Sequence, residues 1–277
     1  MIQKKKSIYK RLLENKKLEK ASGVFLPVVF GLFILLLWQT QGLHKLLNTD
    51  TFTLPLPSRI ISIIFENGSK IMENTVATVI VAVCGLILGS LLGYGIAIIA
   101  TFFPKWGSGG LSVVGAFNAI PIVALAPVIT NWTKGVSKDA NVRSMVAKII
   151  VVMIVCIASM SVNAFRGLSE LKPFSEDLMM SYAANRKTIF LKLRLPNSIP
   201  YIFTALKVSV PASVISAIVS EYFAEYIIGV GRQIRENIVL AQYATAWAYI
   251  AIASMIGIVM YGILMIMEGI LLKARKA

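Results

Sequence analysis

The stretch Asp177–Pro200 reads DLMMSYAANRKTIFLKLRLPNSIP and is a charged, helix-prone segment between two long apolar runs. The runs, Met145–Phe165 and Ile199–Phe223, can each cross a hydrocarbon core, which takes about 20 residues as a helix. A segment between two such spans must lie in water. We therefore expect Asp177–Pro200 to meet a partner at the membrane surface.

Composition places the chain among integral membrane proteins. Hydrophobic residues make up 57% of the 277 residues and charged residues 15%, and the mean hydropathy is +0.75. A soluble domain could not bury so much apolar surface, so we predict an all-α membrane protein. Cys84 and Cys156 fall inside apolar runs and are interpreted as core residues. His44 has no second histidine or cysteine cluster near it, so no metal site is expected.

Six transmembrane helices of about bilayer length are predicted, at residues 23–40, 74–102, 110–132, 145–165, 199–223 and 246–271. Their connections carry 18 Lys and Arg on one side and 8 on the other. A basic excess marks the cytoplasmic side. Both termini and the segment 166–198 are therefore expected in the cytoplasm. This topology accounts for most of the net charge of +15, so a nucleic-acid partner is not needed.

The N-terminal segment, residues 1–22, is basic and precedes the first apolar run. It resembles a secretory signal, but the run is long and no small-x-small cleavage site follows it, so we expect an uncleaved span. Within it, Ile8, Leu12 and Leu13 share one side of a helix among lysines. That pattern suits a helix lying on anionic membrane lipid, and a solvated tail is the alternative.

Four regions follow from these boundaries. Pro55 and Pro57 disfavour a helix in the polar connection after the first span. The predicted regions are the basic segment 1–22, the first span with its outer connection at 23–72, a membrane core at 73–272 that contains the loop 166–198, and a cytoplasmic tail at 273–277.

Two spans carry residues that shape helix packing. Gly85, Gly89 and Gly93 recur every four residues, so one helix face lets another backbone approach closely, and we interpret it as a packing face. Pro121 and Pro127 remove backbone donors from span 110–132 and break or kink it. With Asn118 nearby, this broken helix is either a wall of a transport pathway or a structural kink.

A polar stripe marks span 199–223. Ser209, Ser213, Ser216 and Ser220 are spaced by four, three and four residues, and Glu221 stands at the outer end. Such serines either line a pathway or bond across packed helices, while an intramembrane carboxyl usually pairs or lines a wet cavity. Together with Ser159 and Asn163, one turn apart, they predict a weakly polar lining. The pathway candidates are Asn118, Pro121, Pro127, Ser159, Asn163, Ser209, Ser213, Ser216 and Glu221.

The opening stretch resembles the EAA loop of permease subunits from ATP-binding-cassette importers. The family pattern falls on Asp177-Leu178-Met179, Ala183 and Leu195-Pro196, with Asp177 in place of the usual Glu and Ala183 in place of the usual Gly. The segments PNSIPYIFTALKVSV, AIPIVALAPV and SEYFAEYIIGVGRQI are similar to the nitrate, sulfonate and taurine branch of these permeases. The resemblance covers about residues 50–272.

The resemblance implies a type I importer permease fold with a five-helix core and a cytoplasmic coupling helix at about Met179–Asn185. That helix would lie in a groove of a cytoplasmic ATP-binding-cassette ATPase, and an ordinary basic surface helix is the alternative. The residues expected to couple are Asp177, Met179, Met180, Ser181, Tyr182, Ala183, Ala184, Asn185, Arg186, Leu195 and Pro196. Further implied partners are a second permease copy, giving a homodimer in a bacterial cytoplasmic membrane, and an external solute-binding protein or lipoprotein.

The expected function is inward movement of a small solute by alternating access. The chain has no GxxxxGK[ST] loop for phosphates, so it is not expected to be catalytic, and ATP and Mg would bind the partner ATPase. The solute would be a small oxyanion or sulfonate, or a small vitamin precursor; the scarcity of cations inside the spans argues against a tight anion site. The alternative is a secondary transporter with no ATPase partner, although no inverted repeat is found. An intramembrane hydrolase would need a Ser–His pair, which the sequence does not offer.

Overall fold

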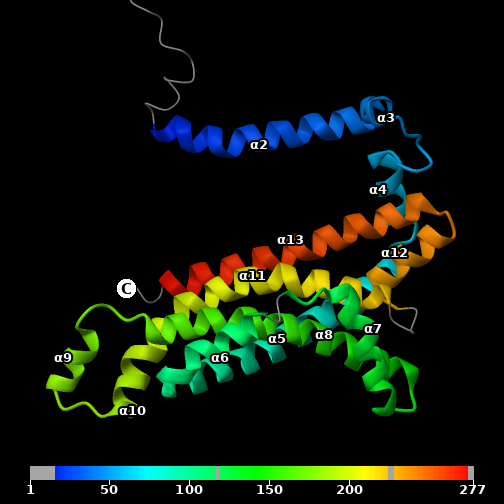
Figure 1. The fold of residues 1–277 in the computed structure, drawn as a ribbon. Helices are drawn as coiled ribbons and strands as arrows, with labels where there is room; N and C mark the ends of the chain where they lie inside the picture. The colour runs from blue at the N-terminus through cyan, green and yellow to red at the C-terminus, as the bar shows by residue number, and fades with distance from the viewer. Residues whose placement is uncertain (1–15, 117–118, 224–227, 274–277) are drawn as a thin grey trace, which may run out of the picture. The chain divides into compact units, whose positions relative to one another are not determined.

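The structure, a computed structural model, describes residues 16–116, 119–223 and 228–273, and all regular elements in these ranges are helical (Figure 1). The predicted all-α fold class is therefore confirmed. By its contacts the chain divides into two units, residues 1–66 and 67–277. Three predictions lie outside the described residues: the pathway candidate Asn118, nearly all of the tail 273–277, and the surface helix carrying Ile8, Leu12 and Leu13.

The first unit holds three helices, α2 (Lys16–Gln39), α3 (Gly42–Leu47) and α4 (Pro57–Glu66). The end of α2 is joined to the start of α4, because Gln39 Nε2 donates to Ser58 Oγ and the Ser58 N–H donates to Gln39 Oε1, both at 3.1 Å. In the turn between α3 and α4, the Thr53 N–H donates to the Asp50 carboxyl and lowers its pKa. Pro57 begins α4, a position where the missing N–H costs nothing.

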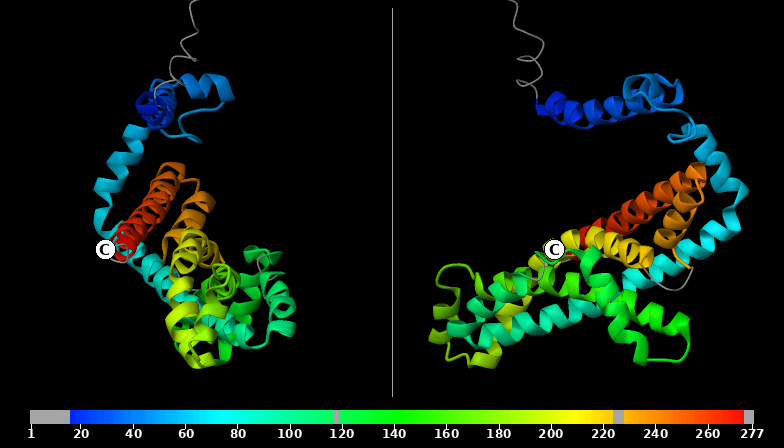
Figure 2. Two further views of the ribbon diagram at one scale, coloured as in Figure 1. Left: turned by 90° about the vertical axis from the view of Figure 1, so that its left-hand side faces the viewer. Right: turned by 45° about the vertical axis from the view of Figure 1, so that its right-hand side comes forward.

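The second unit contains the long helices α5 (Gly68–Phe102), α8 (Ala140–Ser169), α11 (Leu195–Tyr222) and α13 (Tyr243–Lys273). Four helical stretches in the described part of the chain are long and apolar enough to cross a membrane: Gly68–Phe102, Ala140–Ser169, Arg186–Tyr222 and Tyr243–Leu272. Figures 1 and 2 show α5, α8 and α11 running side by side. The chain is thus a multi-pass membrane protein.

The predicted span 110–132 is divided between two shorter helices, α6 (Pro104–Ala116) and α7 (Ile122–Trp132). Pro121 caps α7 with an extended ψ of 120°, so the expected break is confirmed there. Pro127 lies inside α7, which continues through it to a 3₁₀ turn at Thr133–Gly135. In the first unit, the apolar stretch of α2 covers only Phe25–Gln39. The count of six spans therefore stays a prediction.

Much of the segment 166–198, expected as a loop, is helical. It contains the end of α8, then α9 (Ser175–Ser181), α10 (Arg186–Ile189) and a π-helical turn at Phe190–Arg194 that leads into α11. The π turn directly precedes Pro196, whose missing N–H and ring prevent an ordinary bond to the carbonyl of Lys192. Figure 1 shows α9 and α10 at one end of the second unit, and α12 (Val230–Val239) at the opposite end.

Glycines bring α5 and α8 into close contact, which confirms the packing interpretation of Gly85, Gly89 and Gly93. A Cβ added at Gly85 would lie 2.5 Å from Val152 Cβ, one at Gly89 2.5 Å from the Met153 carbonyl oxygen, and one at Gly93 2.7 Å from the Ile157 carbonyl oxygen. Each of these distances is shorter than an ordinary van der Waals contact, so none of the three positions has room for a side chain. The two helix backbones therefore meet along three successive turns.

The other side of α8 packs against α11 through small side chains. Ala164 of α8 and Ala205 of α11 are fully buried, together with Ala97 of α5, Met160 and Leu168. A Cβ at Gly167 would lie 2.8 Å from Ser198 Cα, so α8 and α11 also approach closely where the loop begins. Helix α8 is thus the centre of the unit, in contact with α5, α6, α7 and α11.

Replacing Gly89 tests this packing. We expect Gly89→Ala to lower the stability of the detergent-solubilised protein by about 1–3 kcal/mol, because the new methyl group meets backbone that cannot move aside. The measurement is the thermal unfolding midpoint. Gly95→Ala in the same helix is the control: nothing lies within 4 Å of its Cβ, so stability should hold or rise slightly. Equal midpoints for the two variants would contradict the close α5–α8 contact.

Candidate functional site

The loop between α8 and α11, residues 170–194, is held at its base by Arg194. Its Nη2 donates to both oxygens of the Glu176 carboxyl, at 2.8 and 3.0 Å, and its Nη1 donates to the Leu168 carbonyl at 3.0 Å. Glu176 belongs to α9, Leu168 to α8, and Arg194 leads directly into α11. One guanidinium therefore joins three helices, using the fixed fork of donors that arginine offers.

Asn197 adds a second connection at the same place. Its Nδ2 donates to the carbonyls of Gly167, at 2.8 Å, and Glu170, at 3.0 Å. The Tyr201 hydroxyl, one turn along α11, donates to Glu170 Oε2 at 3.3 Å. The two Asn197 bonds satisfy backbone carbonyls at the C-terminal end of α8, where a helix leaves its last carbonyls without partners. The base of the α8–α11 loop is thus fixed to both membrane helices.

Large apolar side chains are exposed on α9 and its flanks. Leu178, in the middle of α9, is 60% exposed, and the residues that flank the helix, Phe174 and Tyr182, are 82% and 81% exposed. We call these three residues the α9 apolar face. Met180 is also 53% exposed, but it is two residues from Leu178 and lines a cavity beside Arg194. An apolar patch of this kind in a segment outside the membrane spans marks an interaction surface.

The predicted coupling helix at Met179–Asn185 is wrong in its bounds. Helix α9 runs from Ser175 to Ser181, and the chain then turns, with Ala183 in the left-handed region at a φ of 55°. A residue with a side chain adopts this conformation at a cost, and glycine adopts it freely. Ala183 stands where the resembled family has glycine, the residue that suits this conformation. The chain cannot continue as a helix through a left-handed residue, so the turn at Ala183 ends α9.

The remaining coupling candidates surround this turn. Asp177, Met180, Ser181, Tyr182 and Asn185 are exposed, Met179 and Ala184 partly so. Asn185 caps α10, since its side chain accepts from the Thr188 N–H at 2.8 Å. Arg186 lines a cavity of about 340 Å³ together with Glu176 and Arg194, while Leu195 and Pro196 begin α11. The structure thus brings these candidates together at one end of the second unit.

The serine stripe of α11 lies inside helix packing. Ser209, Ser213 and Ser216 are 0% exposed and Ser220 3%. The hydroxyls of Ser213, Ser216 and Ser220 donate to carbonyls of their own helix at 2.7–2.8 Å. Ser209 faces α8, where the Cys156 thiol donates to its carbonyl at 4.0 Å. The serines are thus buried in the helix packing, but these hydroxyl bonds stay within α11 and do not cross to a neighbouring helix. A role in lining a pathway stays a prediction.

On α8, Ser159 and Asn163 are partly exposed, and Asn163 Nδ2 donates to the Ser159 carbonyl at 2.8 Å. Their face of α8 therefore differs from the buried stripe of α11, because the other helices of the described chain do not cover it fully. Pro121 is exposed at the start of α7, and Pro127 is exposed within it. The pathway candidates thus fall into two groups, one buried and one accessible.

Glu221 is fully buried and joins three helices at the opposite end of the unit. Both carboxyl oxygens lie 2.9 Å from the Thr78 hydroxyl of α5, and Oε2 accepts from the Gly231 N–H of α12 at 2.9 Å. Thr78 Oγ1 in turn accepts from the Val230 N–H, and Asn74 Oδ1 from the Gly229 N–H, both at 2.9 Å. We call this the α12 cap cluster. It satisfies N–H groups at the start of α12, which a helix cannot satisfy itself.

Two glycines make the α12 cap cluster sterically possible. Gly229 has a φ of 125°, and a Cβ there would clash with the Glu221 carboxyl carbon; a Cβ at Gly231 would clash with the Ile218 carbonyl oxygen. Lys148 of α8 is 6% exposed and donates to the Ile228 carbonyl at 3.0 Å. The carboxyl of Glu221 thus anchors α12 against α5 and α11, and it is paired rather than open to a cavity.

Sequence reasoning selected Glu221 and missed its partners. Asn74 and Thr78 are one turn apart in an apolar helix, and this polar pair is a signal that could have identified them. Gly229 and Gly231 stand in the SEYFAEYIIGVGRQI segment, but their need for a missing side chain is visible only in three dimensions. Thr78 and Glu221 are 143 residues apart, so no local pattern connects them.

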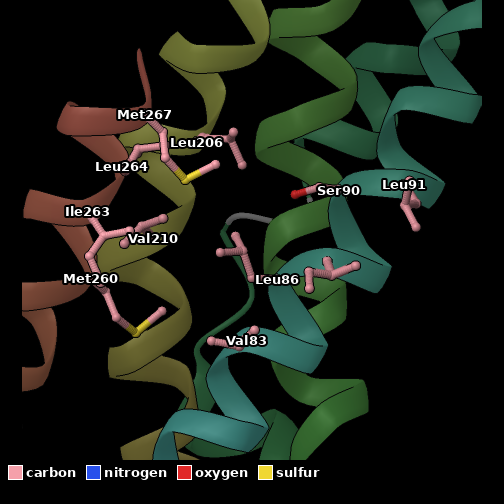
Figure 3. Close-up of a pocket in the computed structure, with 11 residues that line it drawn as sticks. Val83, Leu86, Ser90, Leu91, Leu206, Val210, Met260, Ile263, Leu264 and Met267 are labelled. Carbon is pink, nitrogen blue, oxygen red and sulfur yellow. The ribbon is translucent and has the colours of Figure 1, made fainter. Parts of the chain in front are cut away.

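An apolar cavity of about 420 Å³ lies between α5, α11 and α13 (Figure 3). Its walls include Leu86, Val210 and Met260, and Ser90 contributes a hydroxyl that has no hydrogen-bond partner among the described residues. Apart from this hydroxyl, the lining residues that the structure describes offer no polar side chain. Within the described chain no three His, Cys, Asp or Glu side chains come together as a metal site.

The left-handed turn at Ala183 can be tested by substitution. We expect Ala183→Gly to stabilise the turn by about 1 kcal/mol, because glycine does not pay the side-chain clash of a positive φ. Ala183→Val should destabilise the turn, because a β-branched residue fits the left-handed region of backbone conformation worst. The measurement is the rate of limited proteolysis within residues 182–185. Ala184, whose φ is not positive, is the control position, and Ala184→Gly should give no protection. Protection by Ala183→Val would contradict the turn.

The α12 cap cluster predicts a large difference between two substitutions of Glu221. Glu221→Ala leaves the Gly231 N–H buried without an acceptor, at about 1–3 kcal/mol, and leaves the Thr78 hydroxyl only the Asn74 carbonyl, at 3.1 Å. Glu221→Gln keeps an acceptor oxygen and should lose less. The readouts are the thermal midpoint and hydrogen exchange at the Gly229–Gly231 amides.

The control for this comparison is Glu236→Ala. Glu236 lies on α12, and its carboxyl makes no hydrogen bond or ion pair with the residues that the structure describes. Its removal should change neither readout by much. Fast exchange at Gly231 already in the unsubstituted protein would contradict the cluster.

The chain is similar in sequence to known transport proteins. The chain is 25% identical over 251 residues to the formylaminopyrimidine transport permease protein ThiX of Halalkalibacterium halodurans, covering 90% of this chain and 96% of that one. It is 23% identical over 196 residues to a probable ABC transporter permease protein of Haemophilus influenzae, covering 71% and 76%. It is 23% identical over 157 residues to the nitrate import permease protein NrtB of Leptolyngbya laminosa, covering 57% and 50%.

The family model of the binding-protein-dependent transport system inner membrane component matches residues 85–275. That match includes the C-terminal half of α5, both arms of the broken α6–α7 segment, the α8–α11 loop with its exposed apolar face, and the Glu221 side of the α12 cap cluster. With several apolar helices of membrane-spanning length, the chain belongs to the family of inner membrane components of binding-protein-dependent transport systems.

Proposed function

We propose that the chain is the membrane permease subunit of an ATP-driven importer, in which α9 docks on a cytoplasmic ATP-binding-cassette ATPase. The observation that carries this proposal is the α9 apolar face, with Phe174, Leu178 and Tyr182 between 60% and 82% exposed outside the membrane spans. Large apolar groups of this kind, exposed on a short helix, suit an amphipathic helix that lies in a groove of a partner.

The anchoring of α9 supports a role in coupling. Arg194 binds α9 through Glu176 and α8 through the Leu168 carbonyl, while its own backbone continues into α11. A displacement of α9 by the ATPase would therefore be passed to two membrane helices. ATP and Mg bind the ATPase and not this chain, and ATP binding there drives the exchange between inward-open and outward-open states.

The same proposal includes the fold, the oligomeric state, the orientation in the membrane and the external partner. The fold is that of a type I importer permease, working as a homodimer in a bacterial inner membrane with both termini and α9 in the cytoplasm. An external solute-binding protein delivers the solute at the end where α12 lies. The excess of Lys and Arg on the α9 side supports this orientation.

The solute we propose is small, either an oxyanion or sulfonate or a small organic vitamin precursor. The relatives support both classes, since one is named for a formylaminopyrimidine and another for nitrate. Selection between the classes would belong in part to the binding protein. The alternative, a secondary transporter, has less support. A transporter without an ATPase partner would not need an exposed apolar face on a loop that is anchored to two membrane helices.

Substitution at the centre of the α9 apolar face tests the proposal. We expect Leu178→Asp to weaken binding of the cognate ATPase about 30-fold or more, because a charge in a docked groove removes a contact worth roughly 2 kcal/mol and is itself desolvated. The measurement is recovery of the ATPase with the tagged permease from membranes. Leu240→Asp, a leucine 59% exposed beside α12, is the matched control and should leave recovery unchanged.

Crosslinking shows which end of the permease meets which partner. A cysteine at Ser181, exposed at the end of α9, should crosslink to the ATPase and to no external protein. A cysteine at Gln242, exposed at the opposite end of the second unit, should show the reverse. Crosslinks from Ser181 to an external binding protein, or full ATPase recovery with Leu178→Asp, would overturn the proposal.

A further inference from the structure

A cavity of about 410 Å³ lies between α6 and α8, beside the end of α8 that leads into the α8–α11 loop. Ser112 and Gly115 of α6 form one side, and Val162, Arg166 and Glu170 of α8 form the other. The volume falls in the range of about 300–1,000 Å³ typical of small-molecule sites. Unlike the apolar cavity of Figure 3, its wall combines apolar side chains with a hydroxyl, a cation and a carboxyl.

Arg166 brings to this cavity a cation that forms no ion pair with the carboxylate that also lines it. Its guanidinium is exposed and makes no hydrogen bond or ion pair with any residue in the described ranges. The carboxylate that also lines the cavity, Glu170, accepts a bond from the Tyr201 hydroxyl at 3.3 Å and forms no ion pair with Arg166. A free guanidinium presents a planar fork of donors that matches carboxylate, sulfonate and similar oxyanions.

Polar groups continue from the cavity along α8. Ser159 and Asn163 precede Arg166 by seven and three residues, so they lie on its side of the helix. Both are partly exposed, and Asn163 uses its amide nitrogen on the Ser159 carbonyl at 2.8 Å. A solute moving along this face toward the α9 end would meet these neutral groups first and the cation last.

We infer that Arg166 makes the inner end of the solute pathway selective for small solutes that carry an anionic group. This inference rests on the proposed function, because it takes the α6–α8 cavity as part of an importer pathway. An exposed guanidinium holds an anion weakly and reversibly, which suits a position from which solute must leave. From the sequence we expect few cations inside the spans, and Arg166 is assigned to the loop 166–198. The structure places Arg166 within α8, which extends to Ser169.

The test measures the charge preference of the cavity without needing the solute. Ser112→Cys, on the α6 side, serves as a reporter in a chain whose free cysteines, Cys84 and Cys156, are replaced by alanine. Inside-out membrane vesicles carrying the whole transporter are treated with two thiol reagents of similar size. These are the anionic methanethiosulfonate ethylsulfonate, whose sulfonate is the proposed solute chemistry, and the cationic ethyltrimethylammonium analogue. The readout is the ratio of the two modification rates.

We expect Arg166→Gln to lower the anionic-to-cationic ratio at least about fivefold, because it removes a unit charge beside the reporter. Arg166→Lys should keep most of the ratio. Lys192→Gln, an exposed cation of the α8–α11 loop that does not line this cavity, should leave it unchanged. A ratio unchanged by Arg166→Gln would show that Arg166 acts only at the lipid headgroups, and a reporter unreactive to both reagents would show that the cavity is closed to solutes. Either result overturns the inference. Neither depends on whether Ser181 crosslinks to an ATPase, so the two proposals fail separately.

Discussion

The second unit depends on one steric condition, the absence of side chains where α5 meets α8. Gly85, Gly89 and Gly93 allow the α5 backbone to lie against Val152, Met153 and Ile157 of α8. In a membrane, water does not drive helices together, so association relies on van der Waals contact between closely approaching backbones. With α8 held on one side by α5 and on the other by α11, both ends of α8 become fixed positions from which polar loops are built.

The two polar ends use the same physical device with different groups. At one end, Arg194 and Asn197 donate to carbonyls at the C-terminus of α8; at the other, Glu221, Thr78 and Asn74 accept from amides at the N-terminus of α12. Helix ends leave such groups without intrahelical partners, and inside a membrane they cannot be left bare. Side chains from neighbouring helices satisfy them, which makes each helix end a junction of several helices.

Sequence reasoning recovered what periodicity and composition encode. The apolar runs gave four long helices, the spacing of Gly85, Gly89 and Gly93 gave their packing face, and Pro121 gave the break between α6 and α7. It failed where the decisive contact is distant or depends on a backbone angle. The end of α9 depends on the left-handed turn at Ala183, and the partners of Glu221, Thr78 and Gly231, come from two other helices, α5 and α12. The serines of α11 have a helical spacing, but spacing alone does not tell which neighbour they face.

Both flanks of α9 carry residues in the left-handed region, Phe174 with a φ of 62° and Ala183 with a φ of 55°. Neither is glycine, so each corner holds a conformation that a side chain makes narrow and costly. The orientation of α9 is therefore set by three points, the backbone at each flank and the Arg194 bond to Glu176. A substitution that lets either corner relax would turn the α9 surface without changing any residue on it.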